Sequence, residues 1–108
     1  MAPKSRDFNR LLLNSIDETL LSLGESARQS IYFHIEKNYN ITKNEIPADL
    51  EHFQVALEEI FGIGARFLEI LVMKNLYAKI GHPLNKDQND QLEFIKYIEA
   101  ARQDFTQE

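Results

Sequence analysis

The sequence predicts an all-α fold, a compact bundle of about five helices with a central apolar helix at about residues 64–80. Apolar residues recur at spacings of three and four along most of the chain, which is typical of helices with one buried face. No segment alternates apolar and polar residues with period two, as a half-buried strand would. Glycine, asparagine and proline interrupt the apolar series where helices commonly end.

The first helix is expected over about residues 6–23 and the second over about residues 25–39. Gly24 separates them, because glycine accepts the left-handed conformation that follows a helix end. The first helix has one apolar face, which consists of Phe8, Leu11, Leu12, Ile16, Leu20 and Leu23. The second has a broader apolar surface and should contact more than one neighbour. Asparagines on both sides of Tyr39 mark its end.

A short turn and a third helix follow. Thr42 and Glu45 have the spacing of a capping box, in which each side chain satisfies the backbone N–H of the other residue. Pro47 disfavours helical geometry in the residue before it and so ends this turn. Asp49 is a suitable N-cap for a helix over about residues 49–61. The apolar face of that helix consists of Leu50, Phe53, Leu57, Ile60 and Phe61.

The fourth helix begins near Gly64, runs to about Ile80 and is the most apolar segment of the chain. A helix that is apolar on most sides is normally the central one. Its apolar residues are Phe67, Leu68, Ile70, Leu71, Val72, Met73, Leu76, Tyr77 and Ile80. Gly81 ends the helix, and Pro83 prevents any continuation.

The fifth helix is expected to start at an Asn85 cap and to run to about residue 104. These helices define the organisation of the chain. Residues 1–5 are expected to be a flexible basic N-terminus, residues 6–104 a single helical domain, and residues 105–108 a tail.

Composition narrows the function classes. The 108 residues carry a net charge of −5 and include no cysteine, which excludes disulfides, thiolate metal sites and a cysteine nucleophile. Lys4, Arg6 and Arg10 against Asp7 make residues 1–10 basic, so the remaining chain is acidic. An acidic body argues against a nucleic-acid partner, which needs clustered Lys and Arg. No apolar run could span a membrane and no signal-type stretch follows the first residues, so we expect a cytoplasmic protein without membrane contact.

The glycine pair in "IFGIGARFLEI" raises the possibility of a phosphate-binding loop. A dinucleotide loop needs three glycines after a strand, and the phosphate loop of nucleotide hydrolases needs Gly-Lys-Ser/Thr; both are missing here. Arg66 and the free N–H groups of the fourth helix could still attract an anion. We favour a corner between two helices, in which Gly62 ends one helix, Gly64 starts the next and Ile63 points inward.

No catalytic or metal-binding constellation is evident. His34 has Asn38 at the three- or four-residue spacing of helical metal sites, and His52 has no acidic residue or histidine three residues after it. We therefore expect no metal site at His34, His52 or His82. The carboxylate pairs Asp17-Glu18 and Glu58-Glu59 are adjacent on helices, so their side chains diverge by about 100°. The serines lack the context of a nucleophile. We therefore expect neither enzymatic activity nor a cofactor.

Aromatic and other large apolar side chains are numerous for so small a domain, and some must stay partly exposed. Exposed aromatic residues on helices favour a partner surface. The expected surface lies on the fourth and fifth helices and consists of Phe67, Met73, Tyr77, Phe94 and Tyr97. The partner would be another protein or a second copy of the chain.

Five short segments between Leu20 and Gly81 carry a family resemblance: "SLGES", "IYFHIEK", "EIP", "ALEEIFGIGA" and "LYAKIG". Residues 20–81 resemble the archaeal nitrosopumilus-type signal-transduction output domains. That family often has proline between the two glycines, where this chain has Ile63. The resemblance implies a non-enzymatic output or interaction module in archaeal signalling or regulation.

Two alternatives remain open. Short helices joined by glycine corners also occur in helix-turn-helix proteins, which would make the chain a nucleic-acid-linked transcriptional regulator. A small-ligand sensor would instead need a pocket between the second and fourth helices.

Overall fold

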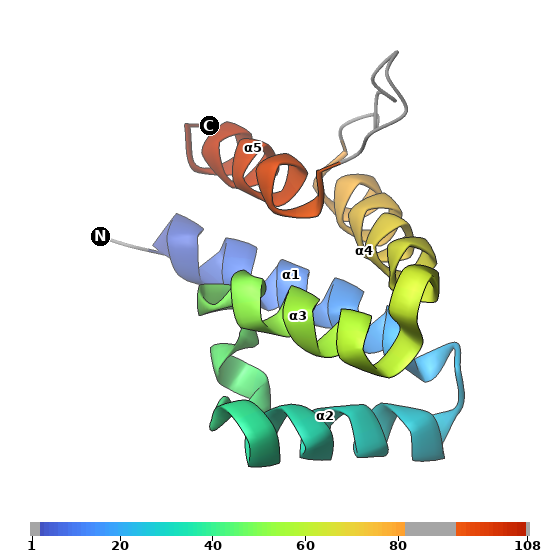
Figure 1. Cartoon of the computed structure of the whole chain (residues 1–108). Helices are drawn as coiled ribbons and strands as arrows, with labels where there is room; N and C mark the ends of the chain where they lie inside the picture. The colour runs from blue at the N-terminus through green and yellow to red at the C-terminus, as the bar shows by residue number, and fades with distance from the viewer. Residues whose placement is uncertain (1–2, 82–92, 108) are drawn as a thin grey trace.

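Five α-helices and two short 3-10 helices form the all-α fold within residues 3–81 and 93–107, the residues that the computed structural model describes (Figure 1). No β-strand occurs in these residues. The helices are α1 (Pro3–Leu21), α2 (Glu25–Tyr39), α3 (Leu50–Phe61), α4 (Ala65–Ile80) and α5 (Phe94–Gln107). Between α2 and α3 lies η1 (Lys43–Ala48), and between α3 and α4 lies η2 (Gly62–Gly64).

The core is organised around α1, which contacts α2, α4, α5 and η1. Every fourth residue of this helix from position 8 to position 20 is apolar and fully buried, so the helix presents one continuous stripe to its neighbours. The stripe consists of Phe8, Leu12, Ile16 and Leu20. Burial of each such side chain stabilises the fold by about 1.5–3 kcal/mol.

The most extensive helix contact joins α1 to α4. It includes a polar pair: Asn75 Nδ2 of α4 donates a hydrogen bond to Thr19 Oγ1 of α1 at 3.0 Å. The Thr19 hydroxyl, which is 1% exposed, donates in turn to the Ser15 carbonyl at 2.8 Å. A buried hydroxyl needs such partners, so this pair fixes how α4 lies along α1.

α2 is attached to α1 through the Asp17 carboxylate. Asp17 accepts hydrogen bonds from Arg28 Nη1 at 2.8 Å and from the Tyr32 hydroxyl at 2.9 Å. Lys43 Nζ lies 3.3 Å from the same carboxylate. Partial burial alone would raise the pKa of Asp17, but these three donors outweigh it and lower the pKa. Ile31 and Ile35 complete the contact as the buried apolar residues of α2.

The helices extend beyond residues 6–104 at both ends. α1 begins at Pro3, inside the segment expected to be flexible, because a proline at the first helical position loses no hydrogen bond. α5 continues to Gln107 because Phe105 packs on the core, with its ring centroid 5.8 Å from that of Phe8. The expected cap Asn85 lies outside the described residues.

The predicted caps around α3 are present. At the start of η1 the backbone N–H of Thr42 donates to Glu45 Oε1 at 2.8 Å, and the Thr42 side chain faces the backbone N–H of Glu45, so both halves of the capping box are present. Asp49 Oδ1 accepts from the backbone N–H of His52 at 3.3 Å and so caps α3. The sequence pattern thus located both helix starts.

The glycine pair forms the corner between α3 and α4. Gly62 has φ 59° and ψ −133°, which ends α3, and Gly64 has helical angles of φ −67° and ψ −18°. The prediction that Ile63 points inward is wrong, because its side chain is 97% exposed. Ala65 takes the inward place instead and is 1% exposed. The turn at Gly62 swings η2 outward, so the first residue of α4 is the one that enters the core.

Substitutions at the two glycines should have opposite effects on stability. A Cβ added to Gly62 would meet no atom within 4 Å. The backbone of Gly62 nevertheless has a positive φ, which is strained for residues other than glycine. We expect Gly62→Ala to lower the free energy of unfolding by about 1–3 kcal/mol. Gly64→Ala should raise it by about 0.4–1 kcal/mol, because its backbone is already helical. Urea unfolding of the two variants measures both; equal effects would contradict this account of the corner.

Candidate functional site

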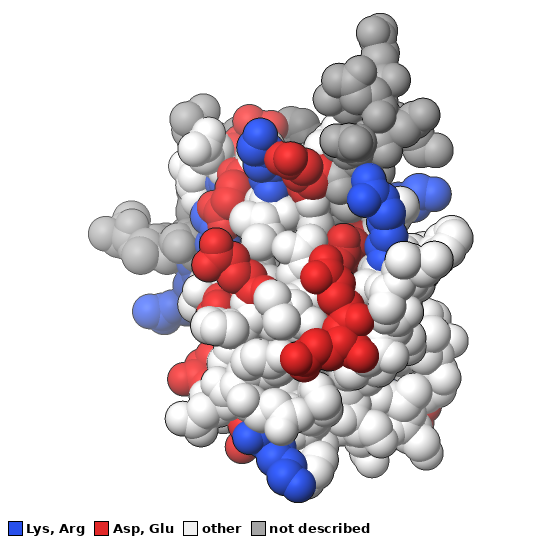
Figure 2. Space-filling model, viewed as in Figure 1, with Lys and Arg blue, Asp and Glu red and all other residues white. Residues whose placement is uncertain are grey.

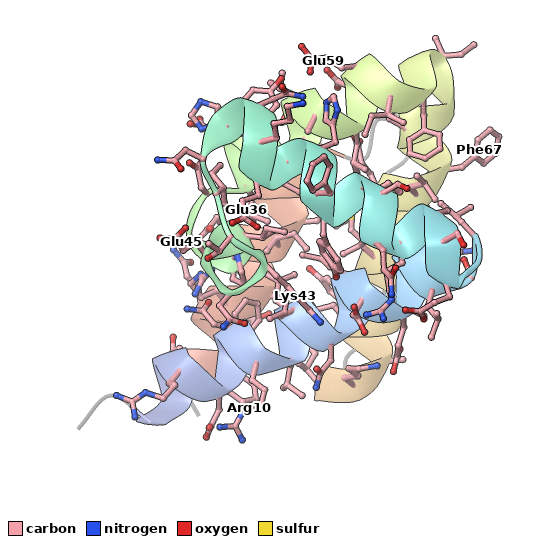
Figure 3. The ribbon with its side chains drawn as sticks, turned by 90° about the horizontal axis from the view of Figure 1, so that it is seen from below. Arg10, Glu36, Lys43, Glu45, Glu59 and Phe67 are labelled. Atoms are coloured by element: carbon pink, nitrogen blue, oxygen red, sulfur yellow. The ribbon has the colours of Figure 1, made fainter. Side chains whose placement is uncertain are left out.

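One face of α4 and the preceding corner carries mostly apolar side chains that are exposed or, at Ile70, half-buried, here called the α4 stripe. Ile63 lies in η2, and the other members recur along α4 at spacings of one, three and four, so they share one side of that helix. They are Ile63, Phe67, Ile70, Leu71, Lys74 and Ala78. Ile63 is 97% exposed, Phe67 75% and Leu71 40%. Figure 3 shows Phe67 pointing away from the ribbon at the edge of the molecule.

The stripe is exposed because the other sides of α4 pack against neighbouring helices. Leu68, Val72 and Leu76 are buried on the opposite side of the helix. Towards α5, the Tyr77 hydroxyl donates to the Tyr97 carbonyl at 2.9 Å. The surface over the α3–α4 corner, at the lower right of Figure 2, is largely uncharged. An uncharged surface with large exposed apolar side chains is typical of a contact site.

The partner surface predicted from the sequence is divided by the fold. Phe67 is exposed as predicted, but Met73 is 0% exposed and Phe94 is 1% exposed, so both belong to the core. Tyr77 and Tyr97 are half-buried at the contact between α4 and α5. α5 packs against this side of α4, and the Phe94 ring also lies 6.3 Å from the Phe53 ring of α3. The prediction is therefore wrong for Met73 and Phe94.

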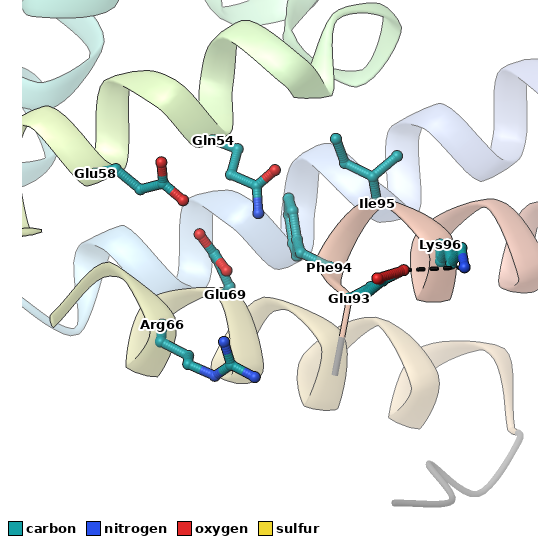
Figure 4. Close-up of a pocket in the computed structure, with 8 residues that line it drawn as sticks. All are labelled: Gln54, Glu58, Arg66, Glu69, Glu93, Phe94, Ile95 and Lys96. Atoms are coloured by element: carbon teal, nitrogen blue, oxygen red, sulfur yellow. Dashed lines mark ion pairs between the residues drawn. The ribbon is translucent and has the colours of Figure 1, made fainter. Parts of the chain in front are cut away.

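A polar groove lies between α3, α4 and the start of α5 (Figure 4). Its volume is about 500 Å³, and its lining residues are Gln54, Glu58, Arg66, Glu69, Glu93, Phe94, Ile95 and Lys96. These residues supply carboxylates, an amide and cations, but no hydroxyl, thiol or imidazole. In Figure 2 acidic side chains gather in the middle of the face that contains α3.

Glu69 is the buried charge of this groove, with an exposed fraction of 6%. Burial raises the pKa of Glu69 above its ordinary value, and a hydrogen bond with Gln54 opposes the rise without cancelling it. The nearby Glu58 carboxylate raises the pKa further, and the Arg66 charge lowers it. Figure 4 shows the Glu58 and Glu69 side chains projecting towards the same space from α3 and α4.

The groove continues to the corner. A second cavity of about 420 Å³ shares Glu58, Arg66 and Glu69 with the first and is also lined by Gly62 and Ile63. The polar groove and the α4 stripe therefore meet at Ile63. Neither of these two cavities is lined by α2, which the ligand pocket of the small-ligand sensor alternative would require.

His34 and His52 lie in ordinary surface contacts. His34 is 3.0 Å from Asn38 and 3.7 Å from Glu59, and His52 is 2.8 Å from Asp49. No group of three potential metal ligands occurs within residues 3–81 and 93–107. His82 lies outside those ranges.

The adjacent carboxylates diverge as expected, because neighbouring residues point to different sides of a helix. Asp17 binds Arg28, whereas Glu18 pairs with Lys79. Glu59 accepts a hydrogen bond from Tyr39 on α2, whereas Glu58 lines the groove.

Comparison of the chain with protein-family models, with curated proteins and with solved structures gives no match. The likeness of residues 20–81 to the archaeal output domains therefore stays a prediction. In the part of the chain that the structure describes, every helix is too short or too polar to cross a membrane.

Glu69→Gln should alter the pH dependence of stability. Because the pKa of Glu69 is raised from 4.5 by folding, its contribution to stability is full below that value and is lost as pH rises through the folded-state pKa. The amide variant should thus be more stable than the wild type at neutral pH, and the difference should vanish in acid. Urea unfolding from about pH 4 to about pH 8 measures this, with exposed Glu51→Gln as control. A difference that is constant over the range would contradict it.

Proposed function

We propose that this chain is a non-enzymatic helical interaction module that acts through protein–protein contacts. The observation that carries the proposal is the α4 stripe, on which Ile63 and Phe67 are 97% and 75% exposed. Leaving apolar surface in water costs about 25 cal/mol per Å², so covering these side chains would favour association. The family resemblance supports a place in archaeal signalling or regulation, in the cytoplasm.

The arrangement of charge supports this proposal over a nucleic-acid-linked regulator. α3 exposes Glu51, Glu58 and Glu59, and the neighbouring groove adds Glu69. These carboxylates would repel a phosphate backbone. Exposed Arg6 and Arg10 form a basic end on α1, which is too small for a broad nucleic-acid footprint.

The proposal is tested by site-specific photo-crosslinking at position 67 in a lysate of the source cells. Position 33 is the matched control, because Phe33 is 66% exposed but lies on α2, outside the stripe. We expect one discrete adduct from position 67 that unlabelled chain competes away. Chain with Ile63→Glu should compete at least about tenfold less well, since a buried charge opposes apolar contact.

Two results would count against the proposal. One is an adduct pattern at position 67 that equals the pattern at position 33. The other is equal competition by the wild-type and Ile63→Glu chains.

A further inference from the structure

The α4 stripe complements itself when a second copy lies against it in the opposite direction. A point midway between Ile70 and Leu71 divides the stripe into pairs, and the two members of each pair are the same number of residues from that point along the sequence. The pairs are Ile63 with Ala78, Phe67 with Lys74, and Ile70 with Leu71. In an antiparallel helix pair with a two-fold axis at that point, the members of each pair would face one another across the contact.

The outer pairs match in size. Among the described residues Ile63 is the most exposed large apolar one, and the exposed residue at the other end of the stripe is the small Ala78. An antiparallel arrangement places the large side chain of one copy over the small side chain of the other at both ends. A parallel arrangement would oppose Ile63 to Ile63 and leave a gap between the two alanines.

The intermediate pairs match in chemistry. Phe67 presents a 75% exposed ring, and a Lys ammonium placed over such a ring is attracted by its quadrupole. Lys74 is exposed, and no hydrogen bond or ion pair of its ammonium occurs within the described residues. By contrast Lys79, the next lysine of α4, pairs with Glu18 at 2.7 Å. The Lys74 stem can also cover apolar surface while its charge stays near water.

Resting on the proposed function, we propose that the partner at the α4 stripe is a second copy of this chain, bound by antiparallel α4–α4 packing about an axis between Ile70 and Leu71. Six residues a side is fewer than the roughly 20–30 of a stable interface, so the dimer is weak and depends on concentration. Such a dimer is isologous and closes on itself, and therefore does not propagate into filaments.

A charge exchange tests the register. Phe67→Lys places the new ammonium opposite Lys74 of the other copy, once on each side of the axis. The repulsion should weaken dimerisation by about tenfold or more. Adding Lys74→Glu places opposite charges there and should restore a large part of the loss. Phe33→Lys, the same change on α2, should leave dimerisation unaltered. Sedimentation equilibrium of the purified chain up to about 1 mM measures all three.

A disulfide test gives the register directly, because the chain has no cysteine of its own. In the proposed dimer Leu71→Cys lies next to its own copy at the axis and should cross-link under mild oxidation. Phe67→Cys would lie roughly 10 Å from its copy along the helix, beyond disulfide reach. We expect Leu71→Cys to cross-link at least about tenfold faster. A mixture of Ile63→Cys and Ala78→Cys chains should form the mixed dimer in preference to either homodimer.

Three results would overturn the self-pairing: a monomer at about 1 mM, a Phe67→Cys chain that cross-links as fast as Leu71→Cys, or a charge exchange without recovery. A purified monomer whose position 67 still gives the competed adduct in lysate would overturn the self-pairing alone and leave the proposed function standing.

Discussion

The buried stripe of α1 is the contact on which the rest of the structure depends. Its residues reach α2, α4 and α5 at once, so no other pair of helices has to form a core by itself. At the amino-terminal end Phe8 receives both the Phe105 ring and the Arg102 guanidinium, which lies 4.8 Å from the ring centroid. At the other end the buried Thr19 hydroxyl fixes α4 through Asn75. With α4 held by its inner side, its outer side stays exposed, as the proposed contact requires.

Most of the fold could be predicted because it follows from local rules. Three sequence signals each determine structure within a few residues of themselves. They are the apolar residue at every fourth position of α1, the glycine at the end of α3, and the Thr42–Glu45 pair. The start of α1 at Pro3 could not be found in this way, since no apolar residue lies between Pro3 and Phe8 to reveal the period.

The candidate site was harder to predict, because it depends on which side of α4 the distant α5 covers. α4 is apolar on more than one side, so its own sequence ranks Phe67 and Met73 equally as surface residues. Only the packing of α5 separates them, burying Met73 completely and leaving Phe67 exposed. Ile63 was misplaced for a related reason: the positive φ of Gly62 decides its direction, and a hydrophobicity pattern contains no backbone angles. The regular spacing of exposed Phe67, Leu71, Lys74 and Ala78 was the available signal.

The corner at Gly62 also sets the rotation of α4 about its own axis. Each residue of an α-helix turns the side-chain direction by about 100°, so the number of residues in the corner decides which side of α4 meets α1. One residue more or less between Gly62 and Ala65 would either expose the core side of α4 or force it to unwind. The outer side has no such restriction, because within the described residues its side chains are exposed or half-buried. The proposed contact can therefore diverge through substitutions on the outer side of α4, whereas the length of the three-residue turn η2 cannot change.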